Sequence, residues 1–512
     1  MNTFLNGLKE TNEFTRTENG AVTRTTTHNK VLDMFAMGAA YRTRNDADCI
    51  LLFSNALKED EAYAMKCLFY ISDCRGGQGE RRFFRVCYNW LANTHTEIAR
   101  RNMKYIAEYR RWDDFYCLVD TPLEKEMFAF LKKQLALDVT CKTPSLLAKW
   151  LKSENTSSPK SQELGAKTRK AFGMTARQYR KTLSILRARI NVLERLMSAN
   201  RWDEIEFDKI PSKAGFIYKN AFARHDIERA KKGAETYADF AKDTTKKVNA
   251  KTLYPYECVH EAMSLMRRGW NPPSLTDTNR LMVNKYWDNL ADYFKGASFN
   301  GMAIVDTSGS MCGSDASAPI NVAISLGMYC AEKAKGPFAN HFMTFSSNPK
   351  LVEVQGVDFC DKVLRMASAD WGGSTNVEAA FDLMLDTAVQ RHCAQSDIPS
   401  ELLVISDMEF NSCVTSGPVS HDRWSYGYNR VPTETLFETL SRKWTQYGYQ
   451  MPHLIFWNVQ SRQENIPADF RSGRVSLVSG FSPSIFEQIM TGKTGLDLMY
   501  EVLNGERYKV IH

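Results

Sequence analysis

The sequence contains no run of about 18 consecutive apolar residues, the length that a membrane-spanning helix requires, so we expect no transmembrane segment. The N-terminus also lacks the basic and then apolar order of a secretory signal, which favours a cytoplasmic protein. The twelve cysteines include no Cys-x-x-Cys pair. Their spacing argues against a zinc ribbon or a disulfide framework and indicates packed, reduced thiols.

Basic residues are scarce in the last part of the chain and frequent in the first. Residues 1–300 contain 50 Lys and Arg against 36 Asp and Glu, whereas residues 301–512 contain 16 against 23. This asymmetry indicates two parts with different partners, a polyanion for the basic part and a cation for the acidic part. A basic surface that is merely solvated explains the first part equally well.

The periodicity of apolar residues indicates three regions. Residues 1–28 are polar and predict an N-terminal arm. Residues 29–295 carry apolar residues at helical spacing, and the related strings Arg111-Trp-Asp-Asp114 and Arg201-Trp-Asp-Glu204 favour an all-α domain of helical repeats. In residues 296–512 strands and helices alternate, which predicts a doubly wound α/β domain with a mostly parallel sheet. Its strands are expected to end at Asp306 and to span residues 340–345, 351–354, 401–406, 453–458 and 475–478.

The most basic stretch of the chain lies between Lys167 and Arg195. We expect one long helix there, with an apolar stripe on one side and cations on the other. A guanidinium group can donate two hydrogen bonds to one phosphate, and an aromatic ring can stack on a base. Single-stranded nucleic acid is therefore a sensible partner. The candidate residues are Lys170, Arg177, Tyr179, Arg180 and Arg187. A solvated helix face is the equally weighted alternative.

A glycine-rich string, Arg75-Gly-Gly-Gln-Gly79, precedes a helix that begins near Arg81 and Arg82. Arg75, Arg81 and Arg82, together with free backbone N–H groups, could contact phosphate. A simple helix-to-helix turn is the alternative.

Oxygen donors follow the apolar strands of the C-terminal region. Asp306, Ser308 and Ser310 lie directly after the first strand, and Thr375 and Asp407 lie in two later loops. Because the carboxyl ends of parallel strands converge at one edge of a sheet, these five residues predict a divalent-cation site. Its hydroxyl-rich ligands favour Mg²⁺ over Mn²⁺ or Ca²⁺. A serine-rich helix cap is the alternative for the first loop alone.

No histidine follows either ligand loop. Glu409, two residues after Asp407, is a candidate general base, but a solvated acid in a surface loop explains it equally well. A hydrolytic metal site needs a general base beside the open position. We therefore expect a binding protein and not an enzyme.

The order Asp-x-Ser-x-Ser, a downstream Thr and a strand-terminal Asp resembles the metal-ion-dependent adhesion site of the von Willebrand factor A domain family, over roughly residues 295–512. The resemblance implies that Ser308, Ser310 and Thr375 coordinate the cation directly. Asp306 and Asp407 would hold it through water. The sixth position would remain open to a carboxylate or phosphate oxygen of a partner.

Further motifs resemble an uncharacterised family of plants, fungi, phages and giant viruses that joins a helical region to an A domain. They are Asp73-Cys-Arg-Gly-Gly-Gln-Gly-Glu-Arg81, Tyr109-Arg-Arg-Trp-Asp-Asp114, Tyr179-Arg-Lys181, Ile210-Pro-Ser-Lys213 and Phe456-Trp-Asn458. This architecture is similar in turn to the Ro autoantigen (TROVE) proteins. There, a ring of HEAT-like helical repeats binds single-stranded and structured RNA, and an A domain closes the ring.

Two functions remain open from the sequence. The first is a non-catalytic, RNA-binding scaffold whose A domain uses its cation to engage a partner or to close the ring. The second is a metal-dependent adaptor between proteins, associated with a virion or an ATPase, without a nucleic-acid role.

Overall fold

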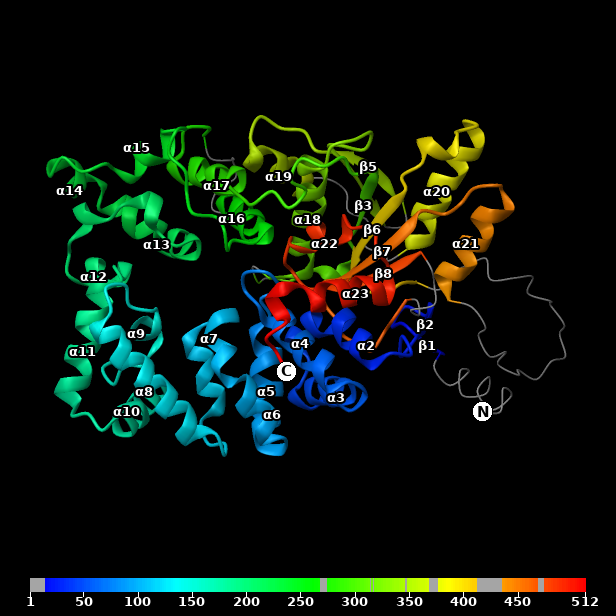
Figure 1. The fold of residues 1–512 in the computed structure, drawn as a ribbon. Helices are drawn as coiled ribbons and strands as arrows, with labels where there is room; N and C mark the ends of the chain where they lie inside the picture. Colours follow the sequence, from blue (N-terminus) through cyan, green and yellow to red (C-terminus); the bar gives the residue numbers. More distant parts are fainter. Residues whose placement is uncertain are drawn as a thin grey trace. The chain divides into compact units, whose positions relative to one another are not determined.

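The structure is a computed structural model that describes residues 14–267, 274–313, 315, 317–345, 348–367, 376–411, 435–467 and 474–512 (Figure 1). It forms two compact units, each described by itself. The α/β unit comprises the described residues within Met1–Cys67, Tyr254–Pro272 and Leu290–Arg507. The helical unit comprises those within Leu68–Leu253, Pro273–Asn289 and Tyr508–His512. Neither unit is continuous in sequence.

A six-stranded sheet forms the centre of the α/β unit, in the order β5-β4-β3-β6-β7-β8. The strands are β3 (Gly301–Asp306), β4 (His341–Phe345), β5 (Lys350–Glu353), β6 (Glu401–Ser406), β7 (His453–Asn458) and β8 (Val475–Ser479). All neighbours are parallel except β4 and β5. The apolar strands β3 and β7 are buried throughout, as expected for strands covered on both faces. The predicted mostly parallel α/β sheet is therefore confirmed.

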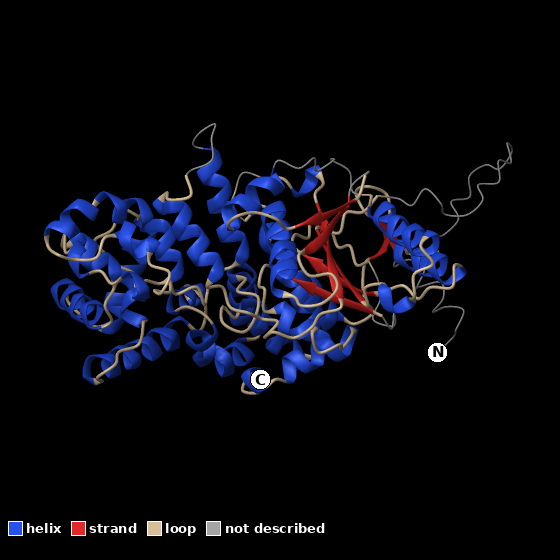
Figure 2. Ribbon diagram, turned by 90° about the horizontal axis from the view of Figure 1, so that it is seen from above, coloured by secondary structure: helices blue, strands red, loops and turns tan. Residues whose placement is uncertain are grey.

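Helices lie on both sides of this sheet (Figure 2). Those of the C-terminal region are α18 (Pro319–Lys333), α19 (Phe359–Ala367), α20 (Val377–Gln390), α21 (Leu436–Gln446), α22 (Ile485–Ile489) and α23 (Gly495–Asn504), with short 3₁₀ turns at Gly309–Met311 and Gln395–Asp397. Helix α18 packs closely on β3 at Gly327, where a Cβ atom would come within 2.6 Å of Val305 Cγ2. This close approach supports the strand that ends at Asp306.

Segments far earlier in the chain complete the α/β unit. They are α2 (Lys30–Met37), the 3₁₀ helix Gly38–Thr43, α3 (Asp46–Glu59), the start of α4 (Glu61–Ser72) and α16 (Pro255–Arg267). Helix α2 contacts β8 and α23, and α16 contacts α18 and α19. The hydroxyl of Ser479 donates to the carbonyl of Phe35.

The polar segment near the N-terminus is an antiparallel hairpin of β1 (Phe14–Arg16) and β2 (Val22–Arg24). The hydroxyl of Thr17 donates at 2.5 Å to the carbonyl of Phe410, and the backbone of Arg24 pairs with that of Ile466. The hairpin therefore packs beside the loop that follows β6.

The helical unit is built from consecutive helices. They are α5 (Arg81–Thr94), α6 (Thr96–Asn102), α7 (Ile106–Tyr109), α8 (Glu124–Thr140), α9 (Leu147–Trp150), α10 (Pro159–Phe172), α11 (Ala176–Arg189), α12 (Leu193–Ser198), α13 (Ser212–Arg224), α14 (Asp226–Lys231), α15 (Tyr237–Lys242) and α17 (Thr278–Asp288). Short 3₁₀ helices span Met103–Tyr105, Trp112–Leu118, Trp202–Glu204 and Phe207–Lys209, and a further one, Glu506–Tyr508, leads into the last residues. Most contacts join helices close in sequence, such as α8 with α10, α11 with α9, and α13 with α14 and α15. Such local packing is the pattern of repeat proteins.

The basic stretch between Lys167 and Arg195 is not one long helix. Helix α10 ends at Gly173, which has a φ of 69° in the left-handed region. Helix α11 then begins with a capping box in which the Thr175 hydroxyl accepts from the backbone of Gln178. A second break at Asn191, with a φ of 50°, precedes α12. The prediction overlooked these end signals because the apolar spacing continues across them.

Two observations, on cysteines and on helix length, apply to all residues that the structure describes. Every cysteine within the described residues is a free thiol. Within the same residues, no helix is long and apolar enough to cross a membrane.

Candidate cation site and nucleic-acid interface

Asp306 lies at the carboxyl end of β3, beside the end of the parallel strand β6. Its carboxylate is fully buried, and the Ser406 hydroxyl donates to Oδ2 at 2.5 Å. The backbone N–H of Ser308 donates to Oδ1 at 2.9 Å. The Ser308 and Ser310 hydroxyl oxygens lie 2.9 Å apart. The first loop therefore gathers a carboxylate and two hydroxyls at the edge of the sheet.

Asp407 follows directly after β6 and is also buried. Its Oδ1 accepts from the backbone of Glu409 at 3.2 Å, and its Oδ2 accepts from Arg462 at 2.9 Å. Burial, and next the charge of Asp407, raise the pKa of Asp306 to about 7. Two buried carboxylates that lie close together repel each other when both are ionised, so a positive charge beside them would stabilise the ionised pair.

The donor set has the chemistry that a hard divalent cation prefers, namely carboxylate and hydroxyl oxygens. Among the described residues, no group of three or more His, Cys, Asp or Glu side chains is placed to hold a metal ion. A cation here would therefore depend on the hydroxyls of Ser308 and Ser310 as well as on Asp306 and Asp407. The fifth expected ligand, Thr375, lies outside the described residues.

Glu409 is not the solvated loop acid that its sequence context suggested. Its side chain is fully buried, and burial raises its pKa. The backbone of Glu18 donates to Oε2 at 2.8 Å, and the Asn465 amide donates to Oε1 at 2.8 Å. No local signal could reveal these partners, because Glu18 lies 391 residues away in sequence.

The glycine-rich motif contacts the Arg-Trp-Asp-Asp motif within the helical unit. Arg81 Nη2 donates to Asp114 Oδ1 at 2.7 Å and to Asp113 Oδ1 at 3.0 Å. The Arg75 guanidinium donates at 2.5 Å to the carbonyl of Glu108. Arg82, at the start of α5, is partly exposed. The structure therefore ties Arg75 and Arg81 to protein acceptors and favours a structural turn over phosphate contact.

Two residues of the basic stretch have structural roles, which corrects the role expected of Tyr179. Its ring is fully buried and its hydroxyl donates at 2.8 Å to the carbonyl of Lys152, so it cannot stack on a base. Arg187 donates to the carbonyl of Ala148 at 2.8 Å and to that of Leu151 at 3.0 Å. These bonds satisfy carbonyls at the C-terminal end of α9.

Lys170, Arg177 and Arg180 differ from these two residues because they are exposed. Within the described residues they make no ion pair. Beside Arg180 opens a groove of about 860 Å³, bordered by α9, α11, α12 and α13. Its further residues Trp150, Glu194 and Tyr218 were not predicted, because they are brought together only by the packing of these helices.

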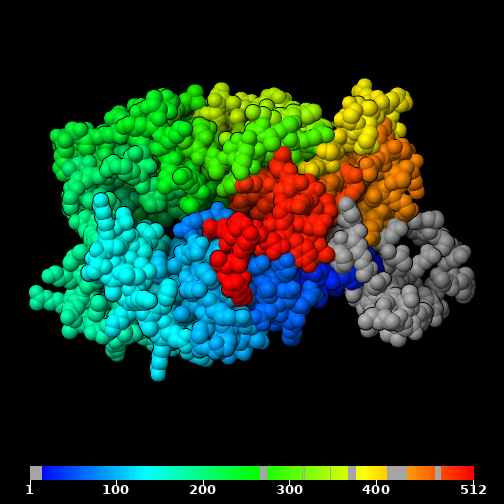
Figure 3. All heavy atoms as spheres, in the orientation of Figure 1, coloured from blue at the N-terminus to red at the C-terminus, as the bar shows by residue number. Residues whose placement is uncertain are grey.

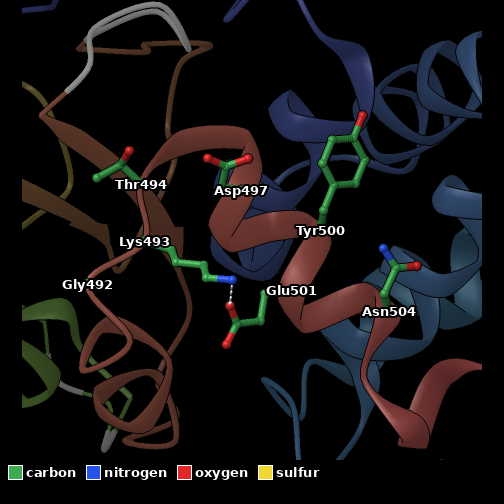
Figure 4. A pocket seen from close by; sticks show the side chains of 7 residues that line it. All are labelled: Gly492, Lys493, Thr494, Asp497, Tyr500, Glu501 and Asn504. Carbon is green, nitrogen blue, oxygen red and sulfur yellow. Dashed lines mark ion pairs between the residues drawn. The ribbon is translucent and has the colours of Figure 1, made fainter.

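A second hollow lies on α23, in the C-terminal segment that Figure 3 shows at the surface in red. Figure 4 shows Lys493 and Glu501 pointing toward one another across it, with an ion pair of 2.5 Å. Tyr500 packs on Tyr63, with ring centroids 4.9 Å apart. Asp497 also lines this hollow, so one lysine faces two carboxylates there.

Comparison with known proteins identifies the family. Residues 17–137 and 136–298 match the family described as "Domain of unknown function (DUF2828)", and residues 300–507 match "Domain of unknown function (DUF7788)". The chain is 31% identical over 518 residues to "Uncharacterized protein L728" of Acanthamoeba polyphaga mimivirus, a similarity that covers 93% of this chain and 84% of that protein. This viral relative agrees with the expected occurrence of the architecture in giant viruses. The chain therefore belongs to the DUF2828 family, and the residues after its helical region match the DUF7788 model.

Proposed function

We propose that this protein is a non-catalytic, cytoplasmic RNA-binding scaffold. The observation that carries the proposal is the exposed cationic surface of α10 and α11, formed by Lys170, Arg177, Arg180 and Lys181. Residues 151–200 contain 11 Lys and Arg against 3 Asp and Glu. Exposed cations without protein partners attract a phosphate backbone, and counterion release then favours binding.

The proposal assigns a second role to the edge of the sheet in the α/β unit. Asp306, Ser308, Ser310, Thr375 and Asp407 would hold Mg²⁺ in the manner of a von Willebrand factor A domain. The cation would present an open position to an acidic partner or a phosphate oxygen. The support is the buried pair of Asp306 and Asp407 beside two serine hydroxyls.

Fluorescence anisotropy with labelled single-stranded RNA tests the first role. Binding is expected to weaken with rising salt, with a slope of log K against log salt of about 0.7 per contacted phosphate. Changing Lys170, Arg177 and Arg180 together to Glu is expected to weaken binding at least about tenfold, since it removes three phosphate contacts. The matched control changes Lys335, Lys350 and Arg391, which are exposed in the α/β unit, to Glu. Equal losses in both triple variants, or a flat salt response, would contradict the proposal.

The second candidate is a metal-dependent adaptor between proteins, favoured by the same carboxylate and hydroxyl cluster. It predicts that a protein partner is retained in Mg²⁺, lost in EDTA and lost on Asp306→Ala, and that the purified protein carries no nucleic acid. The ratio of absorbance at 260 and 280 nm, before and after ribonuclease treatment, separates the two candidates.

A further inference from the structure

The groove bordered by α9, α11, α12 and α13 carries an excess of positive charge. Two acids line it, and one of them, Glu154, is paired with Arg169 at 2.7 Å. Lys149, Arg180 and Arg195 make no ion pair with any residue that the structure describes. Charge complementarity therefore selects a polyanion as the occupant. The six cationic side chains that line the groove are Arg111, Lys149, Arg180, Arg187, Arg195 and Lys213.

Arg111 is held in one orientation where it lines this groove. Its guanidinium donates to Asp113 through Nε at 3.2 Å and through Nη2 at 3.4 Å. The same group lies over the ring of Trp150, with Cζ 4.1 Å from the ring centroid. Because the N–H bonds of a guanidinium lie in its plane, these contacts occupy one edge and one face. The side chain remains 37% exposed, so its second face is open to a ligand.

The positive charge around Arg111 exceeds the negative charge there. Two carboxylates, those of Asp113 and Asp114, are shared by five cationic side chains within 4.0 Å, which leaves three positive charges uncompensated. These side chains are Arg81, Arg85, Arg110, Arg111 and Lys152. An anionic ligand is therefore favoured beside Arg111 even though Asp113 accepts its hydrogen bonds.

The flat and apolar surfaces of the groove distinguish a nucleic acid from other polyanions. Stacking on guanidinium planes and aromatic rings is how proteins hold unpaired bases. Ile217 also lines the groove, and its side chain is 70% exposed. An acidic peptide would use the cations but would leave the face of Arg111 unused. In a duplex the bases are stacked on one another, so only a single strand offers a free base.

We propose that this groove binds single-stranded RNA and that one base stacks on the open face of the Arg111 guanidinium. The phosphates of the strand lie on Lys149, Arg180 and Arg195. The inference rests on the proposed RNA-binding function and adds to it a site and a preference for unpaired bases. Trp150 and Asp113 act by positioning the guanidinium plane, so a lysine in place of Arg111 would keep the charge but lose the stacking surface.

The test measures binding of the full-length protein to a labelled twelve-nucleotide RNA of mixed sequence. The same strand without its bases and the duplex with its complement are the reference ligands. The single strand is expected to bind about tenfold more tightly than the abasic strand, as for one stacked base, and more tightly than the duplex. Arg111→Lys should reduce the preference over the abasic strand to within about twofold and leave binding of the abasic strand nearly unchanged. Arg180→Lys, which keeps the charge at a phosphate contact, is the matched control and should keep the preference.

Charge reversal tests the placement in the groove. Arg195→Glu should weaken binding of the single strand and of the abasic strand severalfold. Arg224→Glu, the same change at an exposed position of α13 that does not line the groove, should leave both nearly unchanged.

Equal binding of the single strand and the abasic strand, equal binding of the duplex, or a preference that survives in Arg111→Lys overturns the stacking site while RNA binding stands. Unchanged binding in Arg195→Glu overturns the placement in the groove in the same way, even if Arg111→Lys fails to fold. Polyglutamate that displaces the RNA at equal affinity also overturns the inference. If none of the three RNA ligands binds, the proposed function itself fails.

Discussion

Arg462 donates a hydrogen bond of 2.9 Å to Oδ2 of the buried Asp407. The same guanidinium lies 3.4 Å from Oε2 of Glu18, on the N-terminal hairpin. Arg462 therefore supplies positive charge to the region in which Asp407 raises the pKa of Asp306. A bound divalent cation would supply positive charge to the same two carboxylates.

Arg462→Gln is expected to destabilise the protein in EDTA by about 2 kcal/mol, because a buried carboxylate loses its charged partner. The loss is below the full value for a buried pair because Arg462 is partly exposed. Mg²⁺ should stabilise this variant more than the parent, since one repulsive charge near the cation is gone. Urea unfolding in EDTA and in Mg²⁺ measures both effects, with Arg391→Gln as the exposed control. An identical response to Mg²⁺ in variant and parent would contradict the expected competition.

The raised pKa of Asp306 predicts an unusual dependence of stability on pH. Between the usual carboxyl pKa near 4 and about 7, the folded state keeps a proton that the unfolded state has lost. The contribution of Asp306 to stability in EDTA should therefore be fully present below about pH 4 and should be lost as the pH rises through 7. From pH 5 to pH 8 this group should remove about 2–3 kcal/mol.

The Asp306→Asn variant should not lose stability in this way between pH 5 and pH 8. Urea unfolding of parent and variant at the two pH values measures the difference. His453 acts in the opposite direction, because burial lowers its pKa to about 4 and its contribution is lost as the pH falls below about 6.5. Since His453 is present in both proteins, the difference between parent and variant isolates Asp306. Mg²⁺ should reduce the slope in the parent alone. Equal slopes in EDTA would show that Asp306 is ionised at neutral pH.

The strands of the sheet could be predicted because they are short, apolar and bounded by turns. The expected strands at residues 401–406, 453–458 and 475–478 correspond to β6, β7 and β8. The placement of Asp306 and Asp407 at adjacent strand ends followed from this order. That part of the site depends only on local pattern and on the topology of parallel sheets.

Other features depend on contacts that no local pattern encodes. The packing of α2 on β8 joins segments more than 400 residues apart. The burial of Tyr179 also could not be predicted, because its position on α11 fits a solvent-facing or an inward-facing side chain equally well. Only the packing of neighbouring segments decides between them. Charge counts likewise could not show that Arg81 and Arg187 are bonded to protein groups, whereas Arg177 and Arg180 make no side-chain ion pair with any residue that the structure describes.

Gly327→Ala should destabilise the α/β unit by about 1–3 kcal/mol, because the added methyl group would lie 2.6 Å from Val305 Cγ2 and force α18 away from β3. Val305 directly precedes Asp306, so stabilisation by Mg²⁺ should weaken too. Thermal unfolding with and without Mg²⁺ measures both changes. Gly309→Ala is the control for stability without Mg²⁺ alone, since its methyl group would meet no atom within 4 Å but Gly309 lies between the proposed ligands Ser308 and Ser310. Equal stability of the two variants would show that α18 can shift without cost.

Asp114 is the acceptor on which the two arginine-containing motifs of the helical unit converge. It is fully buried and accepts from Arg81 at 2.7 Å, Arg85 at 2.5 Å and Arg110 at 3.3 Å. Burial acts to raise its pKa, but the charges of Arg110, Arg81 and Arg85 outweigh burial and lower it. Its contribution to stability is therefore present above pH 4 and is lost as the pH falls below that value.

Asp114→Asn is expected to destabilise the protein by at least about 3 kcal/mol at pH 7, because three guanidinium groups lose a buried counter-charge. Glu126→Gln, which breaks an exposed and solvent-screened pair with Arg100, should cost much less. Urea unfolding followed by circular dichroism compares the two. The same experiment on Arg81→Gln tests the role of the glycine-rich motif directly. If Arg81 has a structural role, the variant should be less stable than the parent, and its RNA affinity should stay within about twofold of that of the Glu126→Gln control. An Arg81→Gln protein of normal stability that binds RNA at least tenfold more weakly would instead restore the phosphate-contact hypothesis for the glycine-rich turn.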